Sequence, residues 1–150
     1  MPPLESALNC GPVPDGSAVV SVEVKNPSND DVHLVAAHLV GKSDLDAEIT
    51  AVLAADGETM IGFTQKPPTS ATSRAIWDRR QPVKGFTVPA STTGFLLVAA
   101  TTKDKGGFDA VDLTYRIGDH TYHQRLNNQL RLFRTSDQHV CDSVTARPGS

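Results

Sequence analysis

Apolar and polar side chains alternate at every second residue through much of this chain, and no other feature restricts its fold as strongly. In the segment SAVVSVEVKN, Val20, Val22 and Val24 alternate with polar residues, and residues 111–117 show the same spacing. Successive side chains of a strand point to opposite faces, so this period predicts strands with one face in a core and one in water. The longest wholly apolar run, FLLVAA at residues 95–100, is typical of a strand covered on both faces.

Turn-forming residues separate these segments and predict about seven short strands. Gly-Asp at residues 118–119 reads as a two-residue hairpin turn in which the glycine takes positive φ. That turn places Tyr115 opposite Tyr122 and Asp112 opposite Arg125. The count and spacing of the strands predict an all-β fold, an antiparallel β-sandwich of immunoglobulin-like type.

One segment, SDLDAEITAVLAADG, gives two conflicting signals. Ser43 with Asp46 resembles a helical capping box, and the apolar residues that follow fit one helical stripe. Every second residue is apolar as well, and strands are expected on both sides. The local signals favour a short helix near residues 44–55, whereas the context favours a strand.

The length of 150 residues fits one domain. Residues 1–16 are rich in proline and predict an extended leader, residues 17–134 the sandwich, and residues 135–150 a polar C-terminal tail.

The two cysteines lie near opposite ends of the chain. Metal sites usually place cysteines two to four residues apart, so Cys10 and Cys141 predict a disulfide that ties the leader to the tail. Two unrelated free thiols of a cytosolic protein are the alternative. A disulfide implies an oxidising, extracytoplasmic compartment.

Charge and motifs argue against several function classes. The formal net charge of −3 lacks the basic excess that nucleic acid requires, so no nucleic-acid partner is expected. The chain has no nucleophile elbow and no phosphate loop, which predicts a protein that is not an enzyme and has no cofactor. No signal peptide or membrane-spanning run is visible, so contact with a membrane is expected only through a segment outside this sequence.

A long connection at residues 67–85 contains the single tryptophan. Trp77 with Arg79 and Arg80 is the candidate ligand-binding group, because tryptophan and arginine are common anchors of interfaces. The favoured interpretation is that Trp77 packs as a lid over one end of the sandwich, because a single large aromatic ring is valuable to a core poor in aromatics.

Four histidines are candidate ligands for zinc or copper: His33, His38, His120 and His123. His120 and His123 are three apart and point to opposite faces of a regular strand, so they cannot share an ion. A site would have to combine His33 with His123, or His38 with His120. A structural role is the favoured interpretation.

Four segments in order resemble a known family. They are VVSVEVKNPSNDDVHLVAAHLVG, QKPP, WDRRQPVKGFTVPASTTGFLLVAATT and AVDLTYRIGDHTYHQRL. Over residues 10–133 the chain resembles the extracytoplasmic immunoglobulin-like domains of actinobacterial cell-envelope proteins. These often follow a single membrane-spanning helix, which this sequence does not contain. The resemblance implies a fold and a compartment, and it implies no catalytic residue.

Together these observations predict a non-catalytic, extracytoplasmic recognition or accessory module of a cell-envelope or secreted protein. Its partner would be a protein or a component of the cell envelope, bound through loops at one end of the sandwich or through an edge strand. A periplasmic metal-binding protein that uses the histidines is one alternative. A structural assembly component is another, and an enzyme of unrecognised type is a third.

Overall fold

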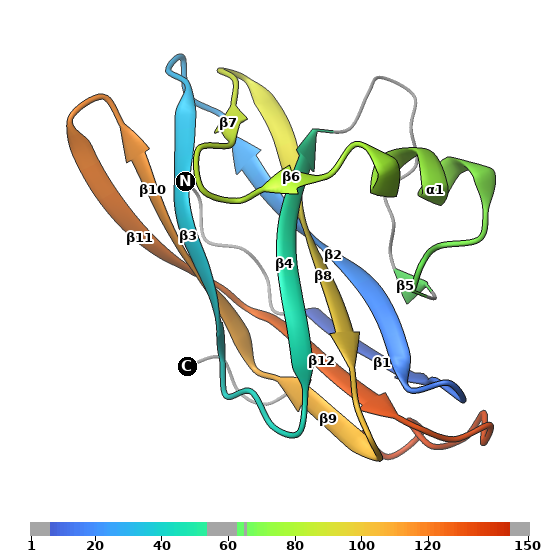
Figure 1. Cartoon of the computed structure of the whole chain (residues 1–150). Coiled ribbons are helices and arrows are strands. Elements are labelled where there is room, and N and C mark those ends of the chain that lie inside the picture. The colour runs from blue at the N-terminus through green and yellow to red at the C-terminus, as the bar shows by residue number, and fades with distance from the viewer. Residues whose placement is uncertain (1–6, 54–62, 65, 145–150) are drawn as a thin grey trace.

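A computed structural model describes residues 7–53, 63–64 and 66–144 of the chain (Figure 1). These residues form three sheets and one short helix. The five-stranded sheet has the order β5 (Phe63–Thr64), β2 (Ser17–Asn26), β8 (Thr92–Thr101), β4 (Asp46–Leu53) and β6 (Gln81–Pro82). The four-stranded sheet has the order β11 (His120–Leu126), β10 (Ala110–Ile117), β3 (Val32–Val40) and β7 (Thr87–Val88). The three-stranded sheet has the order β1 (Ala7–Pro12), β12 (Asn128–Phe133) and β9 (Lys105–Phe108).

The three sheets enclose one main core. Val20 and Leu96 reach it from the five-stranded sheet, Leu34 and Leu113 from the four-stranded sheet, and Leu130 from the three-stranded sheet. Each of these side chains is almost completely buried. The all-β class predicted from the period of two is therefore confirmed, and the sheets are arranged as a sandwich.

The hairpin predicted around Gly118 is confirmed in its register. Tyr115 lies opposite Tyr122, with their rings stacked at 5.5 Å between centroids. Asp112 lies opposite Arg125, and Gly118 has a φ of 59°. A two-residue turn fixes which residues face each other, which is why the sequence was sufficient here.

The prediction that residues 95–100 are covered on both faces is also confirmed. Leu96 of β8 points into the main core, whereas Leu97 belongs to a second cluster under helix α1 (Ala71–Asp78). This helix packs Ile76 and Trp77 against the outer side of the five-stranded sheet. It begins at Ser70, whose hydroxyl accepts a hydrogen bond from the Ser73 N–H. A surface connection with Trp77 packed over one end of the sandwich was expected here, whereas the segment contains a helix and Trp77 packs on the outer side of the five-stranded sheet.

The preference for a helix near residues 44–55 is wrong where the structure describes this segment. Residues 46–53 form β4, which pairs with β8 along its whole length. Ala51 points into the main core and Val52 into the cluster under α1. A helix would leave the edge of β8 unpaired and would bury one face only, so tertiary pairing outweighs the local propensity.

Two further corrections concern the count and direction of the strands. The described residues contain twelve strands rather than about seven, several of them only two residues long. The sheets are also not purely antiparallel, because β1 runs parallel to β12 from Ala7 opposite Asn128 to Pro12 opposite Phe133. Part of the predicted leader is thus a strand of the sandwich, and residues 1–6 lie outside the described residues.

No helix in the described part of the chain is long and apolar enough to cross a membrane.

Candidate binding surface

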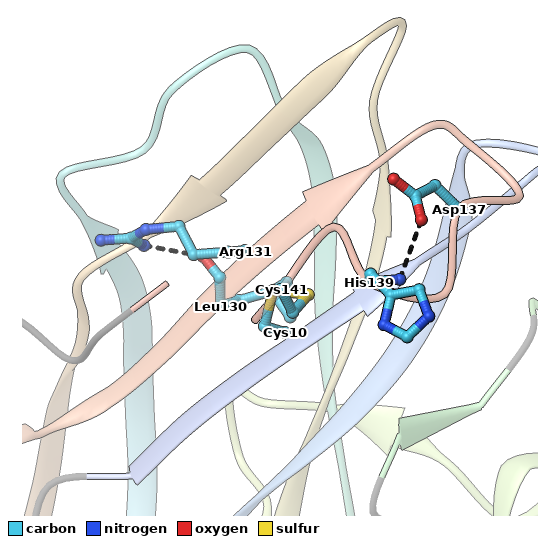
Figure 2. Close-up of a disulfide and its surroundings, with 6 residues drawn as sticks. All are labelled: Cys10, Leu130, Arg131, Asp137, His139 and Cys141. Carbon is cyan, nitrogen blue, oxygen red and sulfur yellow. Dashed lines mark hydrogen bonds between the residues drawn. A yellow bond between two sulfur atoms is a disulfide. The ribbon is translucent and has the colours of Figure 1, made fainter. Parts of the chain in front are cut away.

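The predicted disulfide is present and joins β1 to the C-terminal tail (Figure 2). Cys10 lies on β1 opposite Arg131 of β12, and its Cα is 6.0 Å from that of Cys141 across a sequence separation of 131. The tail before Cys141 folds back in turns, one of which is held by a hydrogen bond from the His139 N–H to the Asp137 carboxylate. The disulfide fixes both ends of the described chain on the same sheet.

The candidate ligand-binding group at Trp77 forms a packed unit in this structure. The Trp77 side chain is buried, and the Arg80 guanidinium lies 3.8 Å from the ring centroid. The Arg80 guanidinium also donates to the Trp77 carbonyl, and the Arg79 guanidinium donates to the Leu53 carbonyl. The ring thus anchors α1, and both arginines contact the protein's own groups, while their exposed surfaces remain open to solvent.

The outer face of the four-stranded sheet collects three of the four candidate histidines. His38 lies opposite Asp112, which in turn lies opposite Arg125, so these residues form one row across three strands. His123 lies opposite Thr114 in the next row. His33 lies in a third row, opposite Arg116.

Neither predicted histidine pair is placed to share a metal ion. His120 lies opposite Ile117, which packs against the core, and is therefore on the other face from His38. His33 and His123 share a face, but β10 lies between their strands, so their backbones are roughly 10 Å apart. Each is instead hydrogen-bonded to a threonine hydroxyl, His33 to Thr87 and His123 to Thr114, both at 3.0 Å. In the described ranges, no group of three or more His, Cys, Asp or Glu side chains could hold a metal ion.

Asp112 is the carboxylate at the centre of this face. Arg125 binds it with two hydrogen bonds, of 2.8 and 3.2 Å, and these lower its pKa below the ordinary value of 3.8. Burial opposes the shift, whereas the positive charge of Arg125 and the nearby His38 and His123 add to it. On the inner face, burial raises the pKa of Tyr115, and the neighbouring Tyr122 adds to this rise.

Residues of β3 and β4 line a groove between the four-stranded and the five-stranded sheet. Its volume is about 400 Å³, and it is lined by Ala37, His38, Leu39, Lys42, Ala47, Ile49 and Val83. Ala37, Leu39 and Ile49 are only partly buried and pack against the main core. Of the residues that line the groove, only His38 was a candidate from the sequence, and there as a metal ligand. The apolar character of both faces of VHLVAAHLV was the one signal that this strand has contacts on each side.

Comparison with models of known protein families and with curated protein sequences finds no match. Among solved structures, the chain is similar to the VesB protease of Vibrio cholerae, with a TM-score of 0.44 and 9% sequence identity. The similarity covers 85% of this chain and 30% of the VesB chain, so this chain spans less than a third of that structure. We base no functional argument on a similarity of this extent.

Proposed function

We propose that the chain is a non-catalytic recognition or accessory module that works outside the cytoplasm, as part of a cell-envelope or secreted protein. In this proposal its sandwich is of immunoglobulin-like type, as the sequence resemblance suggests. Three sheets of mainly antiparallel strands around one core support that assignment.

The Cys10–Cys141 disulfide is the observation that carries the proposal. Disulfides persist in oxidising compartments and are rare in the cytosol, where thiols are kept reduced. This one links the first described strand to the tail, so it restrains almost the whole chain. A restraint of this kind is typical of domains that must stay folded outside the cell.

The non-catalytic part of the proposal is supported by the origin of the shifted pKa values. Among the described residues these belong to Asp112, Arg125 and Tyr115. The shifts of Asp112 and Arg125 follow from their cross-strand hydrogen bonds, and that of Tyr115 follows mainly from burial in the core. Such contacts stabilise a sheet without any catalytic role. A protein partner fits the outer face of the four-stranded sheet, where the Asp112 carboxylate lies on the same face as Arg116 and Arg125.

Localisation tests the proposal directly. The chain would be tagged in its host at its natural gene, and intact cells would be treated with a protease that cannot cross the cytoplasmic membrane. We expect the tagged protein to be digested in cells whose outer layers have been permeabilised, or to be recovered from the medium, while a cytosolic control protein stays intact. Protection together with the cytosolic control would contradict the proposal.

A further inference from the structure

Strand β3 is paired along one side only for most of its length. On one side, β10 pairs with it from Val40 to His33. On the other side, β7 pairs with Val32 and His33, and the turn before β7 hydrogen-bonds to the backbone of Leu34. No strand in the described part of the chain pairs with residues 35–40 on that second side.

The direction of the backbone groups shows which N–H and C=O groups of β3 point to the unpaired side. The Val40 carbonyl accepts a hydrogen bond from the Asp109 N–H, so the backbone groups of Val40 face β10. Successive residues of a strand alternate in this respect. The N–H and C=O groups of Ala37 and Leu39 therefore point to the open side, beside the groove between β3 and β4.

The exposed lining of the groove next to this edge is mainly polar, with a smaller apolar floor and a basic rim. Ala37, Leu39 and Ile49 form the floor, while His38 and Lys42 are its ionisable side chains. Its lining contains no carboxylate. The nearby Asp112 is held by Arg125 on the outer face of the sheet, so it does not neutralise Lys42.

We propose that the groove binds an extended, acidic peptide segment of a protein partner, which adds a strand to the open edge of β3. The peptide backbone pairs with Ala37 and Leu39, and one apolar side chain lies over the floor of the groove. An aspartate or glutamate of the peptide forms an ion pair with Lys42. This inference rests on the recognition function proposed above and assigns it a site and a class of ligand.

The edge also carries features that select the ligand. The pairing with β10 shifts register at Val35, which forms a bulge, and Lys42 lies just beyond the strand. Bulges and lysines at an edge discourage pairing with arbitrary chains. A peptide whose carboxylate pairs with Lys42 offsets the free-energy cost of covering this charged side chain. A second copy of this chain would instead bring its own Lys42 to the shared edge, where the two like charges repel.

Binding of synthetic peptides to the whole, oxidised chain tests the inference. The probes are capped octapeptides in which glutamate alternates with valine, isoleucine or threonine, and matched peptides with lysine in place of glutamate. Two-dimensional NMR of the amide groups reports the site. We expect the glutamate peptides to shift the amide signals of Ala37 and Leu39 saturably, and the lysine peptides to bind at least 10-fold more weakly.

Charge reversal supplies the matched variants. Lys42→Glu is expected to weaken the glutamate peptides at least 10-fold and to strengthen the lysine peptides. Lys103→Glu, at an exposed lysine that does not line the groove, is expected to change neither. Ala37→Pro removes one N–H at the open edge and is expected to abolish binding. If that variant fails to fold, the charge-reversal pair decides the question.

Three outcomes would overturn the inference. They are the absence of shifts at residues 35–40 with millimolar glutamate peptide, equal binding of both peptide sets, and shifts at this edge that depend on protein concentration alone. The last result would show a second copy of the chain at the site. None of these outcomes bears on the compartment, which the localisation experiment tests separately. Failure of the peptide-binding inference is therefore distinguishable from failure of the proposed function.

Discussion

The contacts of Asp112 could be predicted from the sequence, whereas those of Trp77 could not. The contacts of Asp112 are local, because the hairpin turn alone determines that Arg125 lies opposite it. Trp77 packs with Phe95 and Leu97 of β8, and those partners follow from how α1 docks on the sheet. The sequence therefore predicted the ion pair correctly but could not locate the tryptophan.

Replacement of Trp77 is expected to cost stability. Trp77→Ala leaves a cavity between α1 and the five-stranded sheet, so the free energy of unfolding should fall by about 3–4 kcal/mol. Arg80→Ala removes the cation–π contact and the hydrogen bond to the Trp77 carbonyl, and should cost about 1–2 kcal/mol. Urea unfolding followed by circular dichroism measures both values. A loss of less than about 1 kcal/mol for Trp77→Ala would indicate a free surface residue instead.

The low pKa of Asp112 links stability to pH. Its hydrogen bonds to Arg125 lower the pKa in the folded chain, so its contribution to stability is complete above the unfolded value of about 3.9. That contribution is lost as the pH falls through the folded value. We expect Asp112→Asn to lose stability near neutral pH and to show a smaller further decrease below pH 4 than the unmodified chain. Identical pH profiles for the two proteins would contradict this expectation.

At the scale of elements, the pattern of alternation was informative and the local helix signals were not. The strand β4 carries a capping-box pattern, yet its pairing with β8 overrides it. The helix α1 has a serine cap but lies in a segment rich in proline and hydroxyl residues, which hides it. The parallel pairing of β1 with β12 is a contact between the two ends of the chain, and no local pattern indicates it.

Two glycines provide a matched test of the strand arrangement. A Cβ at Gly107 would collide with the Leu130 carbonyl in the β9–β12 ladder, so Gly107→Ala should cost about 3 kcal/mol of stability. A Cβ at Gly118 meets no atom within 4 Å, and Gly118→Ala should cost only the strain of positive φ, about 1 kcal/mol. Denaturant unfolding compares the two variants. Equal costs would contradict the close approach of β9 to β12.

At the scale of the whole molecule, the disulfide joins Cys10 to Cys141, which are 131 residues apart in the sequence. The pairing of Cys10 with Cys141 was predictable because only two cysteines exist and both lie outside the alternating segments. The groove beside β3 was not predictable, since it forms where the edges of two sheets meet, and a single chain pattern does not show which edges are left open.

Loss of the disulfide is expected to destabilise the whole sandwich and not the tail alone. In the chain-entropy model a loop of this length is worth about 5 kcal/mol, and the disulfide holds β1, the strand that pairs with β12. We expect the Cys10→Ser, Cys141→Ser double variant to unfold at a lower urea concentration and to exchange the amide hydrogens of β1 faster. Unchanged unfolding and exchange would contradict a structural role.

The most direct test of an extracytoplasmic, disulfide-linked module is the state of its two cysteines in the native cell. Thiols would be blocked by alkylation before lysis, and the purified protein digested without reduction for mass spectrometry. We expect one cross-linked peptide pair that contains Cys10 and Cys141, and no alkylated cysteine. Recovery of both cysteines in alkylated form would contradict the disulfide and, with it, the compartment proposed for this protein.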